Sequence, residues 1–321
     1  MTPAGVPIAG IGAVRATGPG VAESDVVAGR LRAALAAVAP SGPPVRLLHA
    51  IEETALVAAH EALSGAGLST PYGEDDLGVA LGVEEGIDGI KTRYFRAVLQ
   101  DGPPGASPLV FPLTTPNTIA ARIAILFDLR GETLTVAGGN ISGAHAVGLA
   151  VRALREGHVA TALAGGVTCV EHEFPSAVSG VHPSPGGPPR SGACLLVLAA
   201  GRSCGREEGH ELIGYGEGFG AGDVSDAVRA CLEDARIPPT AIGAVRTAGV
   251  RDWPSVVRAV REAGVTADIV RSPSADLRAA SFPLAVSEAV APSAPARRVP
   301  VLVVGSDCLA GAAAAVVRGG A

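Results

Sequence analysis

Short apolar segments of strand type alternate with helical segments along this chain, and the same order occurs twice. The first half predicts strands near residues 7–14, 77–83, 133–136, 159–165 and 193–199, with helices near 51–63, 118–127 and 142–156. The second half predicts strands near 211–216, 241–247, 268–270, 299–304 and 312–318, with helices near 223–234 and 256–262. Alternation of this kind is typical of α/β layers. The repeat lies in the order of elements and not in the sequence.

Composition sets the frame for this α/β fold. A chain of 321 residues with 48% hydrophobic residues can bury a large core and can hold two domains or one duplicated unit. We place the division between residues 1–200 and 201–321, because the stretch 201–209 is polar and rich in turn residues. The formal charge of -6 argues against a non-specific nucleic-acid binder.

The spacing of the cysteines indicates whether a metal site is present, and the terminal segments indicate where in the cell the protein is expected. The five cysteines show no CxxC spacing, which indicates reduced thiols and neither a disulfide framework nor a zinc site. We expect no metal and no cofactor. The N-terminus lacks the pattern of a secretory signal, and the apolar tail from Val299 to Val317 contains Ser306 and Asp307. A buried strand pair explains that tail better than a membrane span, so a cytoplasmic protein is expected.

Asn140 follows a strand and the turn Ala137–Gly139, and it stands where a predicted buried helix begins. Free N–H groups and aligned peptide dipoles make such a helix start favourable for a thiolate or an oxyanion. Acyl-transfer enzymes often place a nucleophile there. An amide cannot take that role, because it forms no acyl-enzyme intermediate. The alternative is that Asn140 simply caps the helix, which is the commoner role of asparagine at this position.

Several segments around Asn140 together resemble the β-ketoacyl-acyl-carrier-protein synthases of the condensing-enzyme, thiolase-like superfamily. They are Asn117–Ile123, Asp128–Gly131, Leu134–Val136, Ser142–His145 and Ala162–Val167. The resemblance implies a thiolase fold, which has five αβαβα layers and two pseudo-symmetric halves. It also implies that the first half is trimmed relative to the family near Pro40. In this family, the position that matches Asn140 is the acylated cysteine.

The resemblance places the family's two histidines at Ala248 and Asp276, and its active-site lysine near Arg271. Neither alanine nor an ionised aspartate can replace an imidazole, so no catalytic residue is expected at these positions. Arg271 would neutralise Asp276 or form a plain surface ion pair. His145 is interpreted as a core histidine and not as a catalyst.

The resemblance therefore implies a non-catalytic subunit of the chain-length-factor type. Such a subunit forms a heterodimer with an active ketosynthase, meets acyl carrier protein through that complex, and helps to set chain length in type II polyketide or polyene biosynthesis. The family's dimer geometry nominates six residues of this chain for the interface or the tunnel end, against the alternative of ordinary core and turn positions. They are Phe111, Thr114, Thr115, Ile119, Leu134 and Val136.

Two other functions stay open at this stage. The chain could act as an acyltransferase or a malonyl-carrier-protein decarboxylase through a site without cysteine, although enzymes of that kind keep their histidines. It could also be a scaffold or a ligand-binding homodimer with no polyketide role. The sequence thus leaves open whether the chain is an enzyme on its own. The preferred hypothesis is a non-catalytic subunit of a 3-oxoacyl synthase complex.

Overall fold

The computed structural model describes residues 5–15, 24–38, 48–68, 76–84, 86–170, 190–200, 209–220, 223–249, 252–272, 277–291, 299–307 and 311–319. Within these ranges, ten strands form one hydrogen-bonded series in the order β3-β2-β4-β5-β1-β6-β10-β9-β7-β8. The strands of the first half are β1 (Val6–Arg15), β2 (Leu77–Val83), β3 (Thr133–Val136), β4 (Thr161–Thr168) and β5 (Gly192–Ala199). The strands of the second half are β6 (His210–Gly218), β7 (Ala244–Ala248), β8 (Ile269–Arg271), β9 (Val301–Asp307) and β10 (Gly311–Gly319).

The two halves of this series have the same internal order. Counted from its outer edge, each half runs third, second, fourth, fifth and first strand. The three outer strands of each half are parallel, and the two inner ones pair antiparallel. The halves meet where residues 6–8 of β1 pair with residues 210–212 of β6. The repeated order predicted from the sequence is therefore confirmed at the level of topology.

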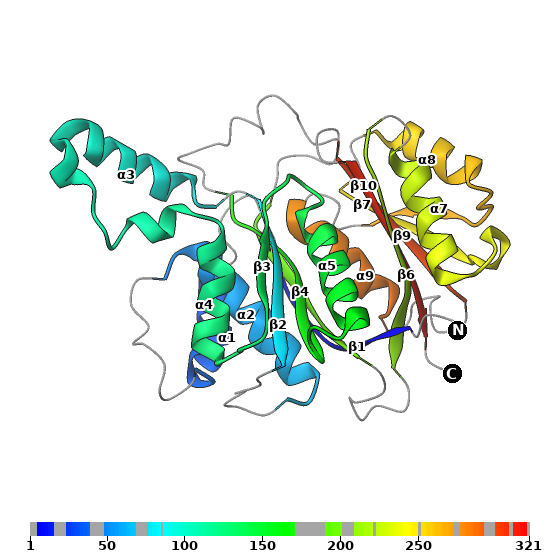
Figure 1. Ribbon diagram of the computed structural model, residues 1–321, viewed down its shortest axis with the longest axis horizontal. Coiled ribbons are helices and arrows are strands. Elements are labelled where there is room, and N and C mark those ends of the chain that lie inside the picture. Colours follow the sequence, from blue (N-terminus) through cyan, green and yellow to red (C-terminus); the bar gives the residue numbers. More distant parts are fainter. Residues whose placement is uncertain are drawn as a thin grey trace.

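Helices lie outside and between the two halves of the sheet series (Figure 1). One outer layer holds α1 (Ser24–Ala36), α2 (Ala50–Gly65) and α4 (Asn117–Phe127). The central layer holds α5 (Ser142–Glu156) and α9 (Ser281–Ala289), and the other outer layer holds α7 (Asp223–Ala235) and α8 (Trp253–Glu262). The predicted αβαβα order of five layers is confirmed.

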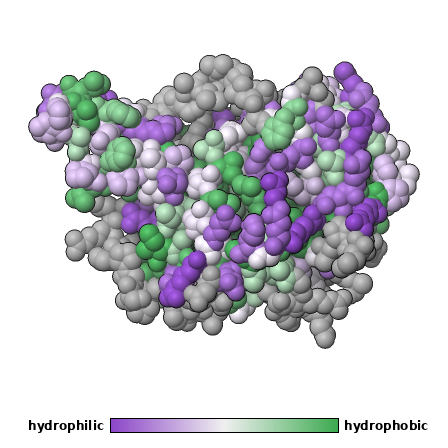
Figure 2. Space-filling view, viewed as in Figure 1, coloured by the Kyte–Doolittle hydropathy of each residue, from purple (hydrophilic) through white to green (hydrophobic). Residues whose placement is uncertain are grey.

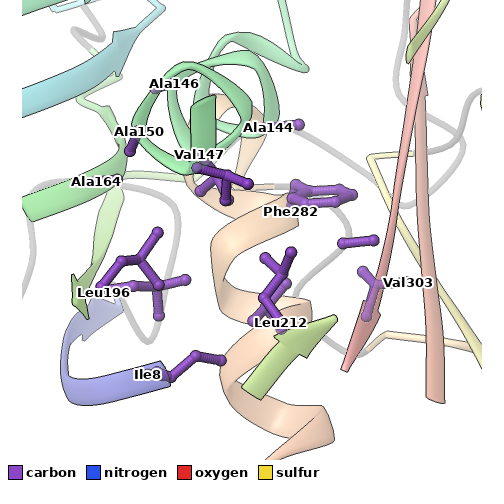
Figure 3. Packing of buried hydrophobic residues seen from close by; sticks show 14 of the residues in the cluster. Ile8, Ala144, Ala146, Val147, Ala150, Ala164, Leu196, Leu212, Phe282 and Val303 are labelled. Atoms are coloured by element: carbon purple, nitrogen blue, oxygen red, sulfur yellow. The ribbon is translucent and has the colours of Figure 1, made fainter. Parts of the chain in front are cut away.

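The central layer contains the core that joins both halves. Figure 3 shows Val147 of α5 beside Phe282 of α9, with Leu196 and Val303 contributed by strands of opposite halves. A helix covered on two sides by sheets must be apolar around most of its circumference, which explains the composition of α5. This helix ends at Gly157, whose φ of 77° provides the left-handed C-cap that the sequence predicted.

Three helices were missed by the sequence reading, namely α1, α9 and α3 (Asp88–Asp101). In α9, Pro283 obscured the pattern, although proline is tolerated in the first turn of a helix. Helix α3 belongs to an arm, residues 88–114, which also contains η1 (Pro103–Gly105) and η2 (Phe111–Thr114) and projects from the body in Figure 1. Helix α3 buries only Gly89 and Ile90, and Ile90 is the one of its residues that joins the described core, so its other apolar residues have no periodic match to that core.

Four predicted strands begin later than expected. Strand β8 begins at Ile269, one residue after the predicted start, and β9 begins at Val301, two residues after it. Strands β4 and β7 also begin late. The strand predicted at 159–165 is β4, which runs from Thr161 to Thr168. The strand predicted at 241–247 begins at Ala244, because Pro239 opens the short helix η3 (Pro239–Ala241) just before it.

Two further observations concern the described residues alone. None of the helices within the described ranges is long and apolar enough to span a membrane. Cys169, Cys194 and Cys231 are buried, whereas Cys204 and Cys308 lie outside the described residues.

Candidate functional site

The start of α5 is built by a tight turn after β3. Gly139 takes a φ of 85°, which favours glycine, and α5 begins three residues later at Ser142. The Ser142 hydroxyl accepts a hydrogen bond from the N–H of Gly138 at 2.8 Å and donates one to the carbonyl of Gly139 at 2.6 Å. Ser142 is thus committed to closing the turn, and it presents Asn140 at the junction of the two halves.

Asn140 is buried, and both ends of the residue are bonded to the second half of the chain. Its backbone N–H donates to Oδ2 of Asp307 at 2.9 Å, and its side-chain Oδ1 accepts from Nη1 of Arg278 at 3.1 Å. The N-cap of α5 is Ile141, with no side-chain cap hydrogen bond. The simple alternative of an asparagine cap is therefore wrong, because the amide oxygen faces a guanidinium and not the free N–H groups of the helix.

Arg278 brings a charge into this buried place. It lies in η4 (Arg278–Ala280) with a φ of 48°, and its side chain is only 2% exposed. The same Nη1 lies 3.3 Å from Oε1 of Glu84, the residue after β2. We call Glu84, Asn140, Arg278 and Asp307 the Asn140 cluster. Two of its members come from each half of the chain.

Two glycines allow η4 to approach closely enough for Arg278 to reach Asn140. A Cβ added at Gly143 of α5, or at Gly166 of β4, would lie 2.0 Å from the carbonyl oxygen of Ala279. Real side chains do not fit such a space. The backbone of η4 therefore rests on these two glycines, and this contact sets the position of the guanidinium.

Of the two positions that the resemblance assigns to the histidines, the structure describes Ala248 and not Asp276. Ala248 is buried at the end of β7, next to Gly249, where an added Cβ would lie 4.0 Å from Cβ of Asn140. The structure thus brings the end of β7 beside Asn140, and alanine supplies no hydrogen-bond donor there. Arg271 is the last residue of β8 and pairs with Thr247 of β7. Because Asp276 lies outside the described residues, the suggested ion pair between Arg271 and Asp276 stays a prediction.

His145 faces β6 and not Asn140. Its Nδ1 lies 3.9 Å from Oε1 of Glu217, and the centroid of its ring lies 5.8 Å from that of Phe219, with the two rings edge to face. Burial lowers the pKa of His145, and the charge of Glu217 opposes that shift. Within the described structure, these contacts support a packing role between α5 and β6.

The nominated tunnel residues are spread over different environments. Phe111 is 56% exposed and its ring contacts Tyr94, whereas Ile119 lies in α4 and its side chain is buried in the core. The hydroxyls of Thr114 and Thr115 donate to backbone carbonyls of Phe111 and Pro112 and so brace η2. A cavity of about 10 Å³ next to Thr115 and Ile119 has room for one water molecule and not for an acyl chain.

Leu134 and Val136 occupy a different kind of position. They lie on β3, which stands at the outer end of the strand order, and both are half-buried. One side of β3 pairs with β2, so its other side offers main-chain groups to a further strand.

Three charged residues of the site were missed from the sequence, namely Glu84, Arg278 and Asp307. Each stands in or beside an apolar segment that folds into a buried element. A charge in such a segment is a usable signal, since buried charges are paired and often mark sites. Among the described residues, no group of three or more His, Cys, Asp or Glu side chains could hold a metal ion.

Comparison with known proteins gives the same picture from sequence and from fold. Residues 43–180 match the family model of the beta-ketoacyl synthase N-terminal domain. A segment of 93 residues is 34% identical to 3-oxoacyl-[acyl-carrier-protein] synthase 2 of Vibrio cholerae, and it covers 28% of this chain and 22% of that protein. A longer match of 297 residues, 28% identical, links 76% of this chain to 70% of a protein named polyketide beta-ketoacyl synthase 1 from Streptomyces halstedii.

A solved structure extends the likeness in fold to nearly the whole chain. It is the ishigamide ketosynthase/chain length factor, with a TM-score of 0.71 and 21% sequence identity over 98% of this chain and 99% of that one.

Proposed function

This chain has the thiolase fold of the ketosynthases and resembles the β-ketoacyl-acyl-carrier-protein synthases, and from that premise we propose that it is a non-catalytic subunit of the chain-length-factor type. It would form a heterodimer with an active ketosynthase and help to set the length of the acyl chain. Acyl carrier protein would meet the complex through the catalytic partner.

The state of Asn140 carries this proposal. An amide side chain forms no acyl-enzyme intermediate. Here the amide oxygen is bound to Arg278 and the backbone N–H to Asp307, so neither group faces a substrate. Ala248 offers no donor beside them. A nucleophile and a carbonyl partner are therefore both missing at the position where the family's chemistry takes place.

Two surfaces support a partner subunit. Among the described strands, β3 pairs on one side only, and such edges are normally covered or blocked because they pair readily with other strands. The arm also carries large exposed hydrophobic residues, which mark interaction sites when they gather. They are Phe95, Leu99, Leu109 and Phe111. Figure 2 shows hydrophobic side chains on the arm and around α5, on the same face as β3.

The test is co-expression with an active β-ketoacyl-acyl-carrier-protein synthase of a type II polyketide system. We expect the two chains to co-purify, and we expect polyketide products on the carrier protein only when both are present, as measured by mass spectrometry. Covalent acylation of the isolated chain, or release of carbon dioxide from malonyl carrier protein without a partner, would instead establish an enzyme. A stable homodimer that does not bind the ketosynthase would support the scaffold alternative.

The role of the arm and of the adjoining Thr115 in chain length has its own test. In the purified complex, Phe111→Ala and Thr115→Phe are expected to change the length distribution of products, because they alter the volume beside the partner's tunnel. The control is Ile125→Ala, which removes an exposed hydrophobic side chain from α4 outside the arm. Unchanged lengths for both variants would remove Phe111 and Thr115 from the tunnel.

A further inference from the structure

We propose that Asp307 is a built-in ligand of the anion site at the start of α5. Its carboxylate occupies the position where the oxyanion of a substrate carbonyl, or a thiolate, would be stabilised. The place beside the Asn140 N–H is therefore occupied by a group of the chain itself. This inference concerns the isolated chain and holds with or without a partner subunit.

The first support is the hydrogen bond itself. The Asn140 N–H lies 2.9 Å from Oδ2 of Asp307, at the length expected for a bond to a charged acceptor. Asp307 is the last residue of β9 and is only 4% exposed. A buried carboxylate is costly unless it is paired or hydrogen-bonded. The start of α5 compensates part of this cost, because a helix N-terminus carries roughly half a positive charge.

The second support is the charge balance of the Asn140 cluster. Nη1 of Arg278 lies between Oε1 of Glu84 at 3.3 Å and Oδ1 of Asn140 at 3.1 Å. Within the cluster, two carboxylates therefore face one guanidinium. Glu84 pairs directly with Arg278, whereas Asp307 accepts from the backbone N–H of Asn140, two residues before α5 begins at Ser142. The positive end of α5 lies close to this contact and favours the charge of Asp307.

This arrangement predicts what happens when the built-in ligand is removed. The variant Asp307→Ala would keep the Glu84–Arg278 pair and would leave the Asn140 N–H without its anion. A small external carboxylate could then take the vacated place. We expect the melting temperature of Asp307→Ala to fall below that of the wild type, and acetate to restore at least half of the loss. Sodium chloride at the same ionic strength should restore much less.

Asp252→Ala is the matched control. Asp252 also accepts a hydrogen bond at a helix start, from the N–H of Ser255 in α8, but from an exposed position. Water can replace it there, so acetate should have no specific effect on this variant. An Asp307→Ala protein that responds to acetate no more than Asp252→Ala would overturn the proposal.

A second measurement covers the case in which Asp307→Ala fails to fold. Asn140→Cys places a thiol at the helix start, and Asp307→Asn neutralises the carboxylate while keeping its shape. Thiolates are favoured at helix starts and disfavoured beside a carboxylate. We expect iodoacetamide to alkylate position 140 about tenfold faster at pH 7.5 in the double variant than in Asn140→Cys, which corresponds to about one pKa unit. Peptide mapping separates this thiol from the native cysteines, and equal rates would refute an anionic occupant.

Discussion

Arg278 combines two features that each cost free energy, a buried charge and a left-handed backbone conformation. Its φ of 48° lies in the region that residues with a side chain rarely adopt, and its side chain is almost fully buried. Both are sustained because the backbone of η4 rests on Gly143 and Gly166 while the guanidinium meets Glu84 and Asn140. A residue under such constraint indicates that its place in the structure is specific.

Removing the charge of Arg278 should be strongly destabilising. Arg278→Met leaves the Glu84 carboxylate buried without this cation, which typically costs about 3–5 kcal/mol of unfolding free energy. Arg318→Met serves as control, because the Arg318–Glu211 pair is largely exposed and should contribute at most about 1 kcal/mol. Urea denaturation measures both. A loss for Arg278→Met no larger than for Arg318→Met would contradict the role assigned to the cluster.

Cys194 should make the stability depend on alkaline pH. Burial in β5 raises the pKa of Cys194 to about 12, above its ordinary value of 9.0. Between these values the unfolded chain releases the proton and the folded chain keeps it. Stability that is complete below pH 9 is therefore lost as the pH rises, at up to about 1.4 kcal/mol per pH unit.

The comparison with Cys194→Ala isolates this contribution. Between pH 8.5 and pH 10, the unfolding free energy of the wild type should fall by about 1 kcal/mol more than that of the variant, measured by urea denaturation in reductant. Equal slopes would show that the thiol ionises alike in both states.

At the scale of elements, the start of α5 depends on how closely η4 packs against it. Gly143→Ala would place a Cβ 2.0 Å from the carbonyl oxygen of Ala279. We expect a loss of about 1–3 kcal/mol from overpacking, together with a shift of η4 that carries Arg278 away from Asn140.

Gly138→Ala is the matched control in the same turn, because an added Cβ there meets no atom within 4 Å. Urea denaturation should show the Gly138 variant close to the wild type. If Gly143→Ala were equally harmless, the close packing of η4 on α5 would not determine the position of the guanidinium.

At the scale of the whole molecule, the two halves share one central core. The strand series is continuous through a short pairing of β1 with β6, but the larger connection is the apolar cluster around α5 and α9. That cluster contains Leu196 from the first half and Val303 from the second (Figure 3). Neither half can expose this surface without exposing the core of the other, so the two should unfold together.

The single tryptophan makes this testable. Trp253 begins α8 in the outer layer of the second half, whereas far-ultraviolet circular dichroism reports helices of both halves. The two probes should give coincident urea transitions. Separate transitions would mean that the halves are independent folding units. In that case the boundary predicted between residues 200 and 201 would also separate two units that unfold independently. Coincident transitions would mean that it does not.

The sequence by itself predicted the order of strands and helices and the place of Asn140 between β3 and α5. Strands β2 and β3 and helix α5 have the bounds that their apolar patterns predict, because buried strands and a helix between two sheets leave a strong local signal. Asn140 was identified from its place after β3 and before α5. The exposed helix α3 escaped notice because, among its apolar residues, only Ile90 reaches the core that the described residues form.

Only the tertiary structure decided what fills the site. Glu84, Arg278 and Asp307 are separated by up to 223 positions in the numbering, and no local pattern relates them to Asn140 or to one another. They meet because the ends of β2 and β9, the start of α5 and the turn η4 converge between the two halves. Charge pairing acts through space over a few ångströms, so it is set by the packing of the layers and not by the order of residues.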